Sequence, residues 1–317
     1  MVRAGYDPQG AVELQKTFVK MSEGKQPGWL EGMFSSHPVS QERVENNQRM
    51  AAALPKGGIV GEDRFQRVMA RLRKTESAYQ AYDKAQKALH NGDKKTARSL
   101  IKKAIRIEPK EGHFYSFLGD IEYRDKRYKT ARGFYDKAID RNEAFFYYHL
   151  RRGLVNEKLE HPVAAKQDLQ RSTQLLPTAG AYNALGNLSR KQGDLNAAKQ
   201  YYASAAQHPS DVGKQAFASL VELDLPQNPQ NYLKLRNVSD ALGRWYVEIA
   251  NPTPRDVRNL VIELRYPDGK GNIRRSKRQL SGTIKAGAKL RLNTRMRVEP
   301  KLADHYGSKL IEAQLAD

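Results

Sequence analysis

Small residues recur at one spacing through the middle of the chain. A first set, spaced by 34, 34 and 33 residues, consists of Ala97, Ala131, Ala165 and Ala198. A large residue follows each of them by four positions, at Ile101, Tyr135, Leu169 and Tyr202. Small side chains let two antiparallel helices approach closely, and a large side chain one turn later fills the space beside the contact. The pattern therefore predicts stacked helical hairpins, each about 34 residues long.

Glycine and proline follow the same period. The matching small positions upstream are Gly119, Gly153 and Gly186. Pro109 and Pro177 lie two periods apart, where a second helix must stop because proline cannot continue it. These columns resemble the tetratricopeptide repeat over about residues 78–210, in about four units, with residues 211–225 as a capping helix. The first unit departs from the pattern because Ala85 replaces the glycine.

This resemblance implies a superhelix whose first helices line a concave groove for a protein or peptide. The positions that it assigns to the groove are Tyr82, Gln86, Asp120, Tyr123, Arg124, Leu150, Glu157, Asn183, Asn187 and Arg190. Asn187 and Arg190 are expected to hold a peptide's backbone or carboxylate by hydrogen bonds. The alternative is a solvated polar face. A further set is expected to pack helices rather than bind a ligand: Tyr79, Tyr82, Phe145, Phe146 and Tyr147.

After Pro226 the hydrophobic period changes to two, which predicts strands. The expected strands are 232–238, 244–250, 259–266, 273–280, 289–298 and 309–315. Residues 267–272 contain the glycines that a hairpin turn requires. The pattern predicts a small immunoglobulin-like β-sandwich over residues 226–317.

The front of the chain predicts two helices separated by a loop. Asp7 and Pro8 are suited to the cap and first position of a helix. The apolar stripe of this helix is Ala11, Leu14, Phe18 and Met21. A loop is expected at residues 24–32, and Pro38 opens the second helix. Residues 51–76 are expected to form a linker and a joining helix, with Phe65, Val68, Met69 and Leu72 on one face.

Two segments of residues 1–50, "AGYDPQGA" and "SSHPVSQER", resemble the end of the HtpX/BepA-like zinc metallopeptidases, relatives of the CAAX prenyl protease. In that family zinc is held by HExxH on one helix and by a glutamate on a later helix. No histidine of this chain is followed by glutamate, so the chain is not expected to hydrolyse peptides or to bind zinc by itself. The resemblance also implies a periplasmic or membrane-associated location.

By the same resemblance, His37 and Arg43 are accessory residues of the catalytic cleft. His37 would contact the zinc-bound water, the substrate oxyanion or the metal. Arg43 would orient a carboxylate of the ligand helix by an ion pair. The alternative for His37 is a helix-cap histidine before Pro38.

A net charge of +20 on 317 residues calls for an anionic partner or reflects a basic but otherwise ordinary protein. The excess is densest after residue 225. Arg274, Arg275, Lys277 and Arg278 either protect an edge strand or dock an anionic membrane surface or an acidic protein. Nucleic acid is not favoured, because no aromatic residue is interleaved with them.

Two functions remain open on the sequence. The chain is either the C-terminal half of a periplasmic zinc metalloendopeptidase, whose repeats recruit substrates or partners for proteolysis or envelope-protein quality control, or a non-enzymatic adaptor that binds partner proteins. The expected architecture is the same in both cases. It is mainly α, with a metallopeptidase remnant at 1–50, a joint at 51–76, repeats at 77–225 and a β-sandwich at 226–317.

Overall fold

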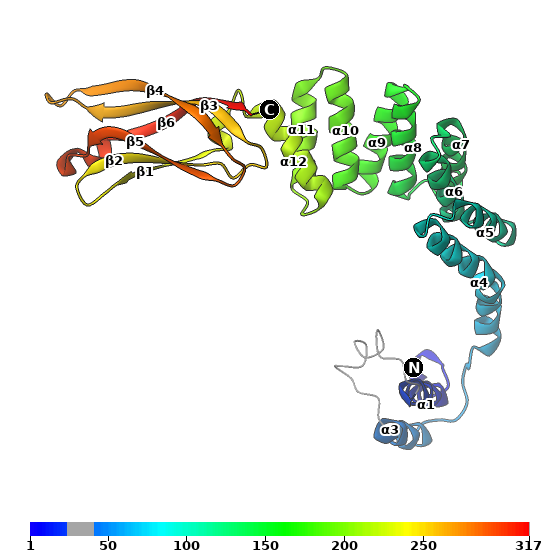
Figure 1. The fold of residues 1–317 in the computed structure, drawn as a ribbon. Coiled ribbons are helices and arrows are strands. Elements are labelled where there is room, and N and C mark those ends of the chain that lie inside the picture. The colour runs from blue at the N-terminus through cyan, green and yellow to red at the C-terminus, as the bar shows by residue number, and fades with distance from the viewer. Residues whose placement is uncertain (24–40, 317) are drawn as a thin grey trace. The chain divides into compact units, whose positions relative to one another are not determined.

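The computed structural model describes residues 1–23 and 41–316. The chain divides into two compact units, Met1–Ser77 and Ala78–Asp317. The division falls inside helix α4 (Glu62–His90), which runs from one unit into the other (Figure 1). None of the described helices has a stretch long and apolar enough to cross a membrane.

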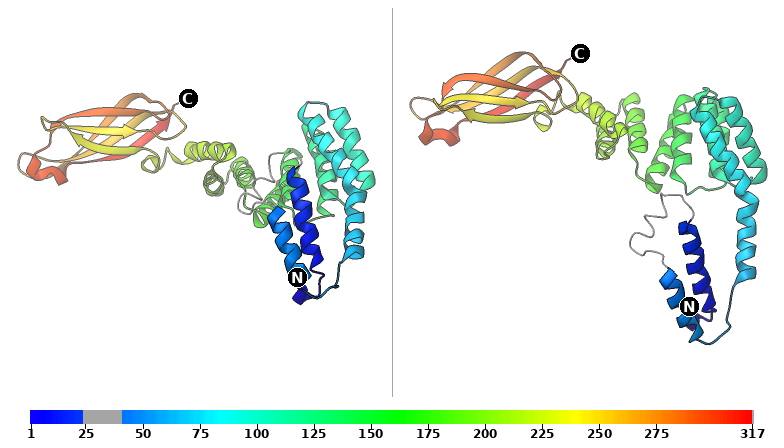
Figure 2. Two further views of the ribbon diagram at one scale, coloured as in Figure 1. Left: turned by 90° about the horizontal axis from the view of Figure 1, so that it is seen from below. Right: turned by 60° about the horizontal axis from the view of Figure 1, so that its bottom comes forward.

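In the front unit, α1 (Gln9–Glu23) packs against α3 (Gln41–Ala52), as Figure 2 shows. The helix start expected at Asp7 is confirmed, since its Oδ1 accepts a 2.8 Å hydrogen bond from the backbone N–H of Gln9. The expected apolar stripe is largely uncovered, with Leu14 51% and Met21 41% exposed. One facing helix in the described part of this unit offers too little surface to cover it. The expected loop at 24–32 and Pro38 lie outside the described residues.

The expected joining helix is the first part of α4. Residues 62–90 contain neither glycine nor proline, so nothing separates the joint from the first repeat helix. The apolar face expected to pack against a neighbour is exposed instead, with Phe65 at 54%, Val68 at 59% and Leu72 at 56%.

The repeat region is a run of antiparallel helices that pack in sequence order. After α4 they are α5 (Lys94–Ile107), α6 (Gly112–Arg124), α7 (Tyr128–Ile139), α8 (Phe146–Lys158), α9 (Pro162–Leu175), α10 (Ala179–Lys191), α11 (Leu195–Ala206) and α12 (Asp211–Asp224). Within each hairpin the second helix lies against the first, as the contacts of α6 with α7, α8 with α9 and α10 with α11 show (Figure 1). The repeat architecture expected from the period is confirmed.

The small and large columns interlock inside each hairpin. A Cβ on Gly119 would lie 2.7 Å from the Tyr135 ring, and one on Gly186 would lie 2.6 Å from the Tyr202 ring. Both tyrosines are fully buried, as are the four alanines of the first small column. The glycine is therefore required by the aromatic ring of the facing helix, because no larger residue fits between the two backbones.

We expect Gly186→Ala to lower the free energy of unfolding by about 1–3 kcal/mol, because the new methyl group overlaps the buried Tyr202 ring. The matched control is Gly133→Ala, since nothing lies within 4 Å of a Cβ at that exposed position of α7. It should raise stability by about 0.5–1 kcal/mol through helix propensity. Urea unfolding of the two variants measures both effects, and equal changes would contradict the interlock.

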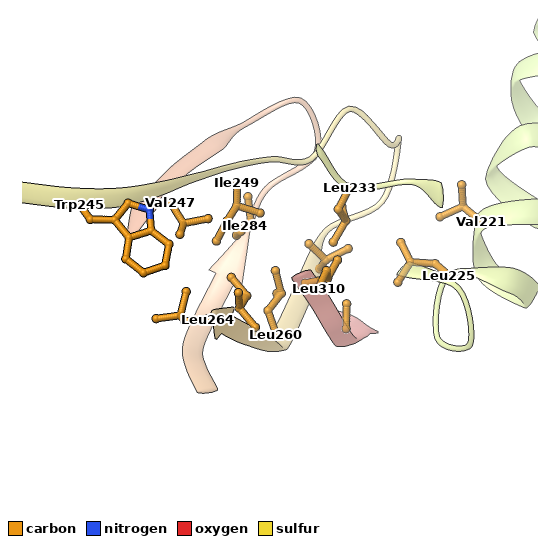
Figure 3. Close-up of a cluster of buried hydrophobic side chains, with 13 residues drawn as sticks. Val221, Leu225, Leu233, Trp245, Val247, Ile249, Leu260, Leu264, Ile284 and Leu310 are labelled. Carbon is orange, nitrogen blue, oxygen red and sulfur yellow. The ribbon is translucent and has the colours of Figure 1, made fainter. Parts of the chain in front are cut away.

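The C-terminal strands form two antiparallel three-stranded sheets. One has the order β1 (Lys234–Ser239), β2 (Arg244–Ala250), β5 (Lys289–Arg297), and the other β4 (Ile273–Ile284), β3 (Val257–Pro267), β6 (Gly307–Leu315). Every expected strand is present; 244–250 has the expected ends, and each of the others is shifted at one end or both. Trp245, Val247 and Ile249 of the first sheet share a buried core with residues of the second, among them Leu260 and Leu264 (Figure 3). This core confirms a two-layer β-sandwich.

The last repeat helix shares its core with the sandwich. Val221 of α12 and Leu225, the residue after the end of α12, are fully buried in the same cluster as Leu233 and the strand residues (Figure 3). Asp224 accepts hydrogen bonds from Lys199 Nζ at 3.1 Å and from the Tyr232 hydroxyl at 2.9 Å. Residues 211–225 therefore end the repeats as expected, and the β-sandwich covers the apolar face that a further repeat would otherwise cover.

Candidate functional site

A pocket of about 350 Å³ opens on the first helices of the repeats. It is lined by Tyr82, Gln86 and Leu89 of α4, by His113, Ser116, Phe117, Asp120 and Arg124 of α6, and by Phe145, Phe146 and Tyr147 at the start of α8. Three successive first helices contribute to it, so the hairpin stacking creates the pocket.

Aromatic rings make up much of the pocket wall. Tyr82 lies 5.4 Å from Phe117 in an edge-to-face arrangement, and Phe145 lies 5.3 Å from Phe146. His113 meets Phe145 edge to face at 4.7 Å. Rings held in this way present large rigid apolar surfaces, which bind apolar side chains at little entropic cost.

Asp120 is the anchor of a polar network beneath these rings. Its Oδ1 accepts hydrogen bonds from the Tyr135 hydroxyl at 2.6 Å and from Arg151 Nε at 2.7 Å. Its Oδ2 accepts one from the Tyr147 hydroxyl at 3.1 Å. The Arg151 guanidinium also lies 4.6 Å from the centre of the Tyr123 ring. The network joins α6, α7 and α8, and it fixes Tyr147 in the pocket wall.

The protonation states of this network are fixed by burial and by the charge of Asp120. Burial, reinforced by Asp120, raises the pKa of both Tyr135 and Tyr147 far above the usual value for tyrosine. Burial alone would lower the pKa of Arg151, but Asp120 outweighs it and raises that pKa. The two hydroxyls therefore remain donors, and the Asp120–Arg151 pair is an internal salt bridge rather than a site for an ion.

Arg124 is the cation that this network does not use. It lies on α6 one turn beyond Asp120, it is exposed, and it forms no ion pair with any residue that the structure describes. Ser116, one turn before Asp120, is 3% exposed and its hydroxyl has no hydrogen-bond partner among the described residues. The pocket thus combines apolar walls, one free positive charge and an unsatisfied buried hydroxyl.

The helices of this region match known repeat models. Residues 82–144 and residues 178–207 each match a family model described as tetratricopeptide repeat. The chain contains tetratricopeptide repeats. The comparison with curated proteins gave no match.

Solved structures of tetratricopeptide-repeat proteins are similar in part. YrrB, described as having an unusual peptide-binding site, is 22% identical, with a TM-score of 0.40, over 49% of this chain and 80% of its own. The first repeat domain of Spaghetti (RPAP3), bound to an HSP90 peptide, is 22% identical, with a TM-score of 0.37, over 38% and 95%. PilW, a type IV pilus biogenesis factor, is 18% identical, with a TM-score of 0.42, over 46% and 69%.

The tetratricopeptide repeats bring together four of the residues expected in the groove, namely Tyr82, Gln86, Asp120 and Arg124. Tyr123 lies beside them beneath Arg151. Tyr79, expected to pack, lies 5.3 Å from Phe114 and does not line the pocket. Phe145, Phe146 and Tyr147, which were expected to pack helices rather than bind a ligand, also line the pocket.

The remaining expected groove residues lie further along the repeats and outside this pocket. Leu150 packs against the cluster of Leu169 and Leu185. Glu157 lines a smaller hollow of about 250 Å³ near the ends of α8 and α10. Asn183 is half-buried on α10.

Asn187 and Arg190 bind other parts of the repeats. The Oδ1 of Asn187 accepts a hydrogen bond from the Tyr202 hydroxyl at 2.8 Å, and Arg190 forms an ion pair with Glu222 at 3.1 Å. Both side chains are exposed, so the expectation that they hold a peptide stays a prediction, and a bound peptide would have to share them with these partners.

Sequence reasoning missed Ser116, His113 and the ring pair Phe145 and Phe146 as pocket residues. Ser116 shares a helix face with Asp120 at the spacing of one turn, so that signal was available. Phe145 is the cap residue and Phe146 the first residue of α8, and positions at a helix start are not part of the pattern of groove positions.

The two accessory residues of the metallopeptidase resemblance belong to the front of the chain. Arg43 is on α3 in the front unit, and His37 lies outside the described residues. Over residues 1–23 and 41–316, no group of three or more His, Cys, Asp or Glu side chains is arranged to hold a metal ion.

Removal of the charge at Asp120 should destabilise the repeats. Asp120→Asn leaves the largely buried Arg151 without its carboxylate, and we expect the free energy of unfolding to fall by about 2 kcal/mol or more. Asp140→Asn is the control, since this exposed carboxylate at the end of α7 has no side-chain partner among the described residues, and it should change stability by less than about 0.5 kcal/mol. Thermal melts of both variants test this. An Asp120→Asn variant as stable as the wild type would show that the repeats do not need the network for their stability.

Proposed function

We propose that the tetratricopeptide repeats are a docking scaffold that holds a segment of another protein in the pocket of α4, α6 and α8. The bound segment presents an apolar or aromatic side chain to the ring walls and a carboxylate to Arg124. The observation that carries the proposal is a preformed aromatic pocket with Arg124 at its side, which has no ion-pair partner within residues 1–23 and 41–316. Pockets with apolar walls and a few convergent polar groups are the usual form of binding sites.

The charges around the pocket favour this orientation of the ligand. Asp120 is neutralised by Arg151, so it does not repel an incoming carboxylate. On the same helix, Glu122 and the neighbouring Asp125 are paired with Arg98 and Arg127. Arg124 is therefore the uncompensated charge at the end of α6, and a guanidinium binds a carboxylate by two parallel hydrogen bonds.

The test uses an unbiased peptide library displayed on phage, selected against the purified chain. Selected peptides, measured by fluorescence anisotropy, should contain an apolar residue near Asp, Glu or the C-terminal carboxylate. Arg124→Glu should weaken their binding by about tenfold or more, because an attractive charge becomes a repulsive one.

The matched control is Arg171→Glu, which makes the same change of charge at an exposed position of α9, outside the pocket. Its Kd should stay within about twofold of the wild type. Equal losses in the two variants would mean that the chain binds acidic peptides through its net charge. Selected peptides that are indifferent to Arg124→Glu would contradict the proposal.

We further propose that this scaffold serves a zinc metalloendopeptidase, as the substrate-recruiting half of a periplasmic enzyme for envelope-protein quality control. The support is the pair of motifs in residues 4–11 and 35–43, in the family's order, together with the capped start of α1 at Asp7. The adaptor function needs neither zinc nor catalysis, and the same groove would serve it.

The coding sequence upstream of Met1 distinguishes the peptidase function from the adaptor function. If the peptidase context holds, the reading frame upstream of Met1 should encode HExxH and a later glutamate-bearing helix that leads directly into the AGYDP segment. An upstream sequence without HExxH would contradict the peptidase context and leave the adaptor. Peptide binding by the groove is expected in either case.

A further inference from the structure

The outward face of the β1–β2–β5 sheet is strongly basic. Strand pairing sets Leu235 opposite Ile249, and Val247 opposite Leu292, on the core side. The alternate residues therefore point away from the core. Those with a positive charge, besides Arg244, are Lys234, Arg236, Lys289, Arg291, Arg295 and Arg297, and all are exposed.

These charges are hardly compensated within the protein. Arg244 forms an ion pair with Asp240 at 2.7 Å, and Glu248 is the acidic residue on the face itself. The other six form no ion pair with any residue that the structure describes. Arg291 lies over the Tyr246 ring, 4.1 Å from its centre. Glu248 faces Arg236 on one side and Arg291 on the other, so the three strands present a large excess of positive charge around one carboxylate.

The opposite face of the sandwich differs. Its outward positions carry two carboxylates, Glu263 and Glu312, against Arg265, Arg275, Lys277 and Lys309, so its excess of positive charge is smaller. The basic run of residues 274–278, for which edge protection and docking were both open, is divided between the two sides of its strand, as alternation predicts. Arg275 and Lys277 fall on one side of β4, while Arg274 and Arg278 fall on the other. The continuous basic surface is built from β1, β2 and β5 instead.

An exposed leucine extends the basic face. Leu242, in the turn between β1 and β2, is 63% exposed. It lies two residues before Arg244, the first residue of β2, which pairs with Arg297 of β5. A flat cationic surface with an apolar residue at its tip matches the headgroup and acyl boundary of an anionic bilayer. Single-stranded nucleic acid would need open aromatic rings for stacking, and the Arg291 guanidinium covers Tyr246.

We propose that the outward face of β1, β2 and β5 docks the protein on a membrane surface rich in anionic phospholipids. The basic side chains contact the lipid phosphates, and Leu242 enters the boundary beneath them. This inference rests on the β-sandwich alone and does not depend on the peptide pocket of the repeats.

The test is flotation of the whole chain with vesicles of phosphatidylcholine and with vesicles that also contain phosphatidylglycerol. Binding is expected to the anionic vesicles alone and should fall steeply as sodium chloride is added. The triple variant Lys234→Glu, Lys289→Glu, Arg297→Glu should weaken it at least about tenfold. None of these three positions faces Glu248 in the register, so no two carboxylates become direct neighbours across the strands.

The matched control is Lys270→Glu, Arg275→Glu, Arg278→Glu in the β3–β4 hairpin, which changes the net charge equally at exposed positions. It should retain binding within about threefold. Thermal melts of both triple variants verify the fold, and Leu242→Ser should weaken binding several-fold without changing its salt dependence. Equal loss in both triple variants, no binding to anionic vesicles, or tight binding of a DNA oligonucleotide in preference to vesicles would overturn the proposal.

Discussion

The close contact between a glycine and an aromatic ring is the constraint on which the repeats depend. Gly119 and Gly186 have no room for a methyl group because Tyr135 and Tyr202 press against their helices. The contact fixes the distance between the two helices of a hairpin. Since each hairpin packs on the next, that distance also decides which residues of successive first helices meet on the inner face.

The same tyrosines link packing to the polar groups of the groove. The Tyr135 hydroxyl donates a hydrogen bond to Asp120, the residue after Gly119. The Tyr202 hydroxyl donates one to Asn187, the residue after Gly186. In the repeat between them the glycine faces Leu169, and Leu154 follows it, so this polar link is missing. One column therefore sets the helix spacing and holds the neighbouring polar side chain in place.

The repeats and the strands could be predicted from the sequence because each follows from a local period. The small and large columns repeat about every 34 residues, and the alternation after Pro226 marks the strands. A local period could not predict which polar side chains have partners within the protein. Asn187 and Arg190 appear free in a single repeat, and their partners Tyr202 and Glu222 belong to other helices. Likewise, the basic surface depends on how β1, β2 and β5 pair, whereas the contiguous run on β4 is divided between two sides.

Helix packing and peptide binding are linked through the same glycine–tyrosine contact, and two equivalent glycines can separate the two roles. Gly119→Ala and Gly186→Ala push against equivalent tyrosines, so they should destabilise the protein by similar amounts. Of the two, only Gly119 is connected to the pocket of α4, α6 and α8: it contacts Tyr135, whose hydroxyl binds Asp120 in the pocket lining. The decisive measurement is the Kd of one selected peptide for both variants, under conditions where both are folded. We expect Gly119→Ala to weaken binding by about tenfold and Gly186→Ala to leave it within about twofold. Equal affinities in the two variants would contradict the link between the interlock and the groove.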